Sequence, residues 1–381
     1  MTRALILLLI AQFLTAFADN AVMFTVFAMV LHAEHFPGWY TPALQASFLL
    51  AFVLLAPWVG ALADAQPKPR ILVAGNLVKL IGAGLLMLGV EPLLAYGLVG
   101  AGAALYSPAK YGILPELTSA EWLVKANSWV EATTIAAIVL GAVAGGRLGD
   151  ASIALALLMV VLLYALSGVV SLFIRSPRET RPQRRALRQF VGHGRTFLAA
   201  SQARFALLGS SLFWATAAVL RVMIIAWAPL VLGTRSSGDI AELTVFLALG
   251  VITGSALVPT MIPLHALFRA RWAGYAMGGQ VLLFALVGGL WPARLMLLGI
   301  GIAGGIFIVP LNAALQDVGH RTIGSGHAVA IQNFAENLAM LFAVGIYTAA
   351  AGAGTGPIPA IAALGLGVIL LNLALARKAP R

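Results

Sequence analysis

The chain has 381 residues, of which 61% are hydrophobic and only 10% are Asp, Glu, Lys or Arg. An ordinary soluble domain is about 45–50% apolar and about 25% charged, so this composition excludes a water-soluble enzyme, a disordered tail and a DNA-binding domain. The net charge is +11 and cysteine is absent, which excludes disulfides, thiol catalysis and cysteine-bound metals, and the placement of the basic residues described below indicates no nucleic-acid partner.

Continuous hydrophobic runs fill most of the chain, and each run of about 20 residues predicts one membrane-spanning helix. The first run continues past the length of a signal-peptide core and has no cleavage site placed after such a core, so we expect a retained helix. A β-barrel is excluded, because its strands form alternating segments of about 10 residues. We predict twelve spans, at residues 4–31, 41–63, 71–90, 93–114, 127–147, 152–174, 205–232, 241–263, 272–291, 294–315, 326–350 and 357–376.

The positions of the basic residues predict the orientation of these spans. If the N-terminus is cytoplasmic, eighteen of the 24 Lys and Arg residues fall on the cytoplasmic side, three on the outer side and three within spans. Cytoplasmic segments of membrane proteins carry an excess of Lys and Arg, so we expect both termini in the cytoplasm. Eight arginines lie between residues 175 and 204, and we interpret this segment as a loop that faces lipid headgroups and helps to set the topology; a specific partner site is the alternative.

The same basic segment divides the spans six and six. We therefore predict an N-terminal six-helix bundle at residues 1–174, a cytoplasmic basic linker at 175–204 and a C-terminal six-helix bundle at 205–381. Three pairs of similar segments recur in the two halves at nearly constant spacing: residues 106–110 with 308–312, 127–131 with 332–336, and 68–70 with 269–271. Two pseudo-symmetric six-helix bundles are typical of a major facilitator transporter, whose substrate site lies near the membrane midplane between the halves.

Two charged residues lie near the middle of predicted spans. Asp19 is about fifteen residues into the first span, and Arg221 is about sixteen residues into the seventh. They are 202 residues apart, which is also the spacing between Pro108 and Pro310. A charge at the bilayer centre costs about 2.5–3.5 kcal/mol on insertion scales, so each of these residues is expected to have a charged partner or a functional role. We predict that both face one central substrate site; the alternative is that they pair with each other and hold the halves together.

Other polar residues within spans extend this candidate site. Lys79 is expected to snorkel or to pair within its own half. A neutral set of charges of both signs indicates a substrate that carries both signs, or an anion with a proton, and leaves zwitterion, sugar phosphate and drug cation open. The further substrate-binding candidates are Asn20, Lys110 and Glu336, with Glu131, Asn127, Gln332, Asn333 and Asn337 in supporting positions.

The segment between the second and third spans resembles a signature loop of major facilitator transporters, Gly-x-Leu-Ala-Asp-Arg-x-Gly-Arg-Arg. Residues 60–70 keep its Gly and its Asp, which is Asp64, whereas Ala65 replaces the following Arg. We predict that Asp64, Lys68 and Arg70 form a gating loop that ties the cytoplasmic helix ends together in one conformational state.

Four stretches of the chain resemble the bacterial lysophospholipid transporters of the major facilitator superfamily, and the resemblance covers most of the chain. They are residues 17–21, residues 106–116, residues 125–127 with Glu131, and residues 319–326 running into 332–337. The resemblance implies alternating access and facilitated diffusion of lysophosphatidylethanolamine (2-acyl-glycerophosphoethanolamine) inward across the inner membrane of a Gram-negative bacterium. It also implies a cytoplasmic acyltransferase/acyl-ACP synthetase as functional partner, which reacylates the product in phospholipid repair, and no cofactor.

Other functions stay open at this point. A proton-coupled major facilitator exporter of drugs or metabolites would use Asp19 or Glu336 as its proton carrier. A membrane enzyme is not expected, because all six histidines fall in loops or at span ends and the chain has neither His-Glu-x-x-His nor Gly-x-Ser-x-Gly, so we predict no catalytic residue and no metal site. A structural or receptor role is disfavoured by the cost of buried charges in both halves.

Overall fold

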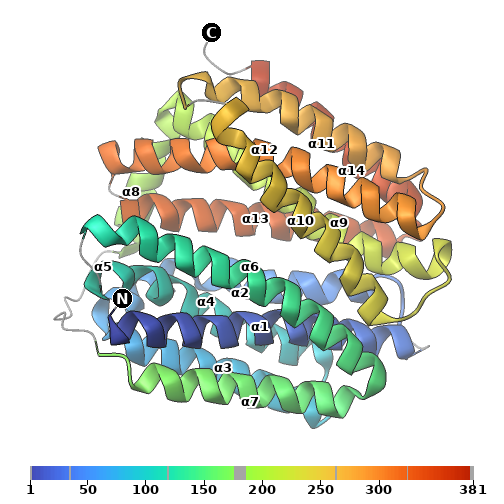
Figure 1. Cartoon of the computed structure of the whole chain (residues 1–381), viewed down its shortest axis with the longest axis horizontal. Helices are drawn as coiled ribbons and strands as arrows, with labels where there is room; N and C mark the ends of the chain where they lie inside the picture. Colours follow the sequence, from blue (N-terminus) through green and yellow to red (C-terminus); the bar gives the residue numbers. More distant parts are fainter. Residues whose placement is uncertain are drawn as a thin grey trace. The chain divides into compact units, whose positions relative to one another are not determined.

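The computed structural model describes residues 2–33, 36–117, 120–175, 186–261, 264–323 and 325–377, and these residues are almost entirely helical (Figure 1). The helices in chain order are α1 (Arg3–His32), α2 (Tyr40–Ala65), α3 (Lys68–Met87), α4 (Pro92–Gly112), α5 (Leu114–Leu117), α6 (Ala120–Ala151), α7 (Ile153–Leu172), α8 (Ala186–Ala199), α9 (Ser201–Val231), α10 (Ser237–Met261), η1 (Leu264–Arg269), α11 (Ala270–Phe284), α12 (Leu290–Thr322), α13 (Ser325–Gly352) and α14 (Pro357–Arg377).

Each predicted span overlaps a helix of the structure. Within the described ranges, nine helices are long and apolar enough to cross a membrane. The other three predicted spans coincide with α2, α4 and α11, and α11 has 15 residues, fewer than the roughly 20 that a bilayer requires. The prediction of an all-α, multi-pass membrane protein is confirmed, while the count of twelve spans and the cytoplasmic side of both termini stay predictions.

The chain divides into two compact units, and neither unit is one continuous stretch of the sequence. Unit 1 comprises Met1–Glu34, Ser47–Gln189 and Ser236–Ala241, and unit 2 comprises His35–Ala46, Phe190–Arg235 and Glu242–Arg381. Each unit therefore contains a short segment from the part of the chain that otherwise forms the other. The predicted bundles at 1–174 and 205–381 stay a prediction.

The predicted basic linker is partly helical. Residues 176–185 of it lie outside the described residues, α8 follows, and α9 already begins at Ser201. Phe197 of α8 is fully buried, and the ring of Phe190 meets that of Phe334 in α13 edge to face at 5.5 Å. The contact between Phe190 and Phe334 packs α8 against α13 within unit 2.

Helix packing in unit 1 depends on glycine where α1 meets α6. A Cβ atom built on Gly145 in α6 would lie 2.3 Å from the carbonyl oxygen of Ala21 in α1 and 2.4 Å from its Cα. Small residues allow such close backbone approach, which membrane helices use because lipid gives no hydrophobic drive for their association. α1 also packs against α7, and α3 packs against α4 and α7.

Gly145→Val should lower the thermal midpoint of the purified protein in detergent, since overpacking of a close contact typically costs about 1–3 kcal/mol. Gly84→Val is the matched control, because a Cβ atom built on Gly84 in α3 meets nothing within 4 Å. Equal midpoints for the two variants, measured by heating and size-exclusion recovery, would contradict the close approach of α1 and α6.

Helix α9 has the central position in unit 2. It packs against α12, α13 and α14, and α11 packs against α12 and α14. Pro310 lies inside α12 and Pro108 lies inside α4, so each proline of the sequence repeat lies within a helix.

Candidate functional site

Asp19 in α1 is the acceptor of two side-chain hydrogen bonds inside unit 1. Its Oδ2 accepts from Nζ of Lys79 in α3 at 2.8 Å, and its Oδ1 accepts from the hydroxyl of Tyr164 in α7 at 2.9 Å. The side chain of Lys79 is 1% exposed, whereas that of Asp19 is 23% exposed. The expectation that Lys79 pairs within its own half is confirmed, and Asp19 accepts from side chains of two helices of its own unit, α3 and α7.

The ammonium of Lys79 is surrounded by groups that compensate its burial. Besides the carboxylate, Nζ donates to Oγ1 of Thr15 at 3.0 Å. It also lies 4.9 Å from the ring centre of Tyr106 and 5.6 Å from that of Tyr164. Aromatic faces attract cations most strongly where water is excluded, so this cage lets a fully buried lysine stay paired inside a helix bundle.

A chain of hydrogen bonds continues from this cage through the interior of unit 1. Thr15 Oγ1 donates to Oδ1 of Asn76 at 2.8 Å, and Nδ2 of Asn76 donates to Oγ of Ser167 at 2.9 Å. Ser167 Oγ then donates to the backbone oxygen of Ala11 at 2.7 Å. Sequence reasoning missed these residues, although Asn76 and Lys79 stand three residues apart in one apolar run and so fall on the same face of α3.

The remaining candidates of unit 1 have different surroundings. Asn20 donates through Nδ2 to the backbone oxygen of Ala16 in its own helix, at 2.9 Å. Lys110 is half-buried in the last turn of α4. The side chains of Asn127 and Glu131, which were expected in supporting positions, lie outside the described residues.

A second polar cluster lies in unit 2, between α12 and α13. Nε2 of Gln332 donates to Oδ1 of Asn312 at 2.9 Å and to Oε1 of Glu336 at 2.8 Å. Glu336 is 7% exposed, so its carboxylate is held in the interior by an amide. Asn312 is the counterpart of Lys110 in the paired segments 308–312 and 106–110, and the structure adds it to the candidate site.

The other two candidates on α13 bond within that helix. Nδ2 of Asn337 donates to the backbone oxygen of Asn333 at 2.7 Å, and both side chains are half-buried. The structure therefore brings Gln332 and Glu336 together with Asn312, and it leaves the adjacent stripe of Asn333 and Asn337 as a separate pair.

Arg221 lies on α9, half-buried, in unit 2. Asp19 lies in unit 1, so a site that both share stays a prediction. A carboxylate offers about four lone-pair positions, and two of those on Asp19 accept from Lys79 and Tyr164. Because Asp19 is also partly exposed, it retains capacity for a further hydrogen-bond donor.

The predicted gating loop has one strong contact in the described residues. Nζ of Lys68 lies 2.6 Å from Oε1 of Glu116 in α5, and the two side chains are 10% and 4% exposed. A Cβ atom on Gly112 would lie 2.8 Å from Cε of Lys68, so the glycine leaves room for the lysine. Arg70 is exposed, and the side chain of Asp64 lies outside the described residues.

A groove of about 510 Å³ runs along unit 2 between α11 and α12. Arg269, Trp272 and Gln280 line it together with small and apolar residues of both helices. Its lining includes none of the predicted site residues whose side chains the structure describes, so the groove is separate from both polar clusters.

Comparisons with known proteins agree with this architecture. The family model described as Major Facilitator Superfamily matches residues 8–344. The lysophospholipid transporter LplT of Photorhabdus laumondii is 44% identical over 355 residues, which cover 91% of this chain and 88% of that protein. LplT of Yersinia pestis (strain Pestoides F) is 42% identical over 354 residues, covering 91% of this chain and 87% of that protein.

Solved structures share the fold at low sequence identity. A crystal structure of a mutant of the nucleoside transporter NupG matches with a TM-score of 0.75 and 13% identity, covering 98% of both chains. The E. coli fucose:proton symporter FucP matches with a TM-score of 0.64 and 15% identity, covering 99% of this chain and 98% of that one.

Proposed function

Because the chain belongs to the major facilitator superfamily and, within it, to the bacterial lysophospholipid transporter family, we propose that it moves lysophospholipids across a membrane. The observation that carries this proposal is the 42–44% identity to proteins named LplT over 91% of the chain. These relatives are transporters, so the expectation that the chain is a transporter rather than an enzyme is confirmed.

The finer proposal names the substrate, the direction and the place. The chain takes lysophosphatidylethanolamine from the outer leaflet to the inner leaflet of the inner membrane of a Gram-negative bacterium, by facilitated diffusion. A cytoplasmic acyltransferase/acyl-ACP synthetase then reacylates it in phospholipid repair. The zwitterionic headgroup suits polar groups of both signs, because its ammonium seeks a carboxylate and its phosphate seeks guanidinium or ammonium donors.

The contacts within each unit suggest how the headgroup is bound. Asp19 accepts a hydrogen bond from the headgroup ammonium through its remaining lone pairs, while Lys79 and Tyr164 keep the carboxylate in place. Arg221 and Lys110 bind the phosphate. Gln332 holds the carboxylate of Glu336 in position for a contact with the headgroup. The acyl chain stays in apolar surroundings while the units rock and expose the headgroup site to one leaflet at a time.

Uptake of labelled lysophosphatidylethanolamine by spheroplasts tests this proposal. Asp19→Asn and Arg221→Gln should each lose most of the uptake, because each removes the charge that pairs with one pole of the headgroup. Lysolipid derived from phosphatidylglycerol and a cationic dye serve as comparison substrates. Near-normal uptake by both variants would contradict this binding site.

One observation keeps the exporter alternative in the test. Glu336 is a buried carboxylate bonded to an amide, an arrangement that suits a proton carrier. Collapse of the proton gradient stops a proton-coupled exporter and leaves facilitated movement of lysolipid running. Uptake of lysolipid that persists with a protonophore therefore supports facilitated diffusion, and uptake that stops with it shows proton coupling and contradicts facilitated diffusion.

A further inference from the structure

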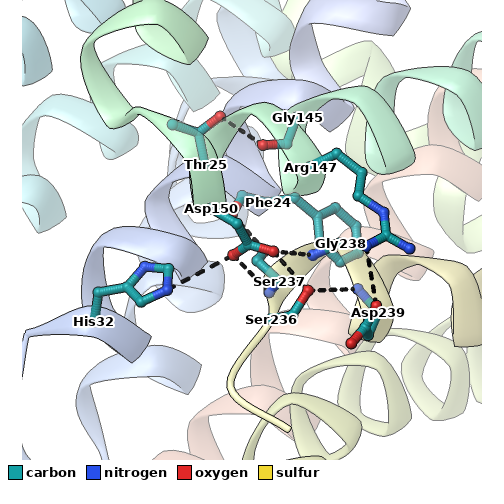
Figure 2. A network of polar contacts seen from close by, with 10 residues as sticks. All are labelled: Phe24, Thr25, His32, Gly145, Arg147, Asp150, Ser236, Ser237, Gly238 and Asp239. Carbon is teal, nitrogen blue, oxygen red and sulfur yellow. Dashed lines mark hydrogen bonds and ion pairs between the residues drawn. The ribbon is translucent and has the colours of Figure 1, made fainter.

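Asp150, near the C-terminal end of α6, caps the first turn of α10 within unit 1 (Figure 2). Its Oδ1 accepts from the backbone N–H of Ser237 at 2.8 Å. Its Oδ2 accepts from the backbone N–H of Gly238 at 2.8 Å and from the hydroxyl of Ser236 at 2.7 Å. We call these four residues the Asp150 cap. The first N–H groups of a helix have no partner within it, and the helix dipole favours an anion there, so a carboxylate is well matched to this position.

The same turn is also held from α1. Ser237 is 1% exposed, and its hydroxyl donates to the backbone oxygen of Phe24 at 2.9 Å. A Cβ atom on Gly146 would lie 2.8 Å from the backbone oxygen of Ser237, so α6 and the start of α10 meet backbone to backbone. The turn is therefore enclosed between α1 and α6, and any reagent must displace it to reach Ser237.

The ion pairs at the edge of the Asp150 cap should stabilise the turn less than the hydrogen bonds at its centre. Arg147 lies 3.1 Å from Asp239, with side chains that are 51% and 44% exposed, and Nε2 of His32 lies 3.8 Å from Oδ1 of Asp150 (Figure 2). Exposed ion pairs contribute little because water and salt screen them. The hold on the turn is therefore expected to come from the three donors that reach Asp150.

The path of the chain gives this cap a mechanical role. Ser236–Ala241 belongs to unit 1, and the same helix continues from Glu242 in unit 2. A displacement of one unit relative to the other therefore acts on the cap through a continuous helix. We propose that Asp150 is a positioning residue that holds the first turn of α10, and that release of this turn is a step of the transport cycle; this rests on the proposed function, in which transport proceeds by alternating access.

The absence of cysteine from the chain allows a direct test with one introduced thiol. Ser237→Cys places a near-isosteric thiol at a position that is 1% exposed, and its alkylation rate reports release of the turn. The protein is purified in phospholipid nanodiscs, where a water-soluble maleimide reaches both faces. Asp150→Asn in this background keeps the side-chain shape and removes the charge, and labelling should become about tenfold faster, as expected for loss of a good helix cap.

A matched control lies in the same network. Asp239→Asn makes the same chemical change at the exposed rim, and labelling at residue 237 should stay within about twofold of the Ser237→Cys protein. Ser236→Ala is a second test variant that keeps Asp150 itself, removes one donor to its carboxylate and should also speed labelling. Lysophosphatidylethanolamine, added to the protein with Asp150 intact, should speed labelling relative to the diacyl lipid of the nanodisc.

The outcomes separate this inference from the function on which it rests. Labelling that is equally slow with Asp150→Asn and Ser236→Ala overturns the holding role. Faster labelling in these variants with no effect of lysolipid, for a protein that takes up lysolipid in spheroplasts, overturns the role in the cycle. If the wild-type protein takes up no lysolipid, the proposed function fails, while the variants still decide whether Asp150 holds α10.

Discussion

Replacing Asp19 and Lys79 together, as Asp19→Asn with Lys79→Met, should give a protein that folds as well as the wild type and does not transport. Removing one partner of a buried ion pair leaves an uncompensated charge, which costs about 3–5 kcal/mol. Lys79 is 1% exposed, so Asp19→Asn, which leaves its ammonium without a carboxylate, should be strongly destabilised. Lys79→Met should lose less, because the carboxylate of Asp19 is 23% exposed and still accepts from Tyr164. The double variant removes both charges, and most of that loss should be recovered.

The double variant separates a structural pair from a substrate-binding one. If Asp19 and Lys79 only stabilise unit 1, the recovered protein transports normally, and the assignment of Asp19 to the headgroup site is wrong. Tyr164→Phe gives an intermediate test, because it keeps both charges and removes only the hydroxyl that donates to Oδ1 of Asp19. Thermal midpoints in detergent and lysolipid uptake in spheroplasts are measured for all four variants.

Breaking the contact between Lys68 and Glu116 should also destabilise the protein by about 3–5 kcal/mol, because both side chains are buried and Nζ lies 2.6 Å from Oε1. Lys68→Met and Glu116→Gln should each show this loss in thermal unfolding. The exchanged pair, Lys68→Glu with Glu116→Lys, should recover part of it, since the charges again compensate each other.

Arg70→Gln is the control for that pair. Arg70 belongs to the same predicted gating loop but is exposed, so its loss should change stability by less than about 1 kcal/mol. A loss as large as that of Lys68→Met would show that stability at this end of unit 1 depends on the general positive charge of the loop rather than on the contact with Glu116.

The hydrophobic runs predicted the helices well because span length is set by the thickness of the bilayer. They predicted the helix ends poorly. The run at 127–147 belongs to α6, which extends over Ala120–Ala151, and the run at 241–263 belongs to α10, which begins at Ser237. The extra turns contain Asp150 and Ser237, and the carboxylate of Asp150 accepts from the backbone N–H of Ser237. A hydropathy pattern does not identify a turn whose polar groups are satisfied by another helix.

The sequence predicted which residues belong to the candidate site, but it did not predict which of them bond to each other. A charge inside an apolar run marks Asp19, Lys79 and Glu336 as exceptional without any structure. The choice of Lys79 as the partner of Asp19 depends on which faces of α1 and α3 meet, and this follows from close helix packing rather than from either run alone. Thr15 and Tyr164 gave no signal, because hydroxyl side chains are common in membrane helices.

The assignment of short segments to the opposite unit limits how this chain can be divided. A fragment that ends between α7 and α8 lacks Ser236–Ala241, so the carboxylate of Asp150 would lose the two backbone donors and the hydroxyl that it binds. The complementary fragment would lack His35–Ala46. Two separately expressed halves are therefore each incomplete. Fragment complementation should work only when both halves are synthesised in the same membrane, where each short segment can pack against the other half.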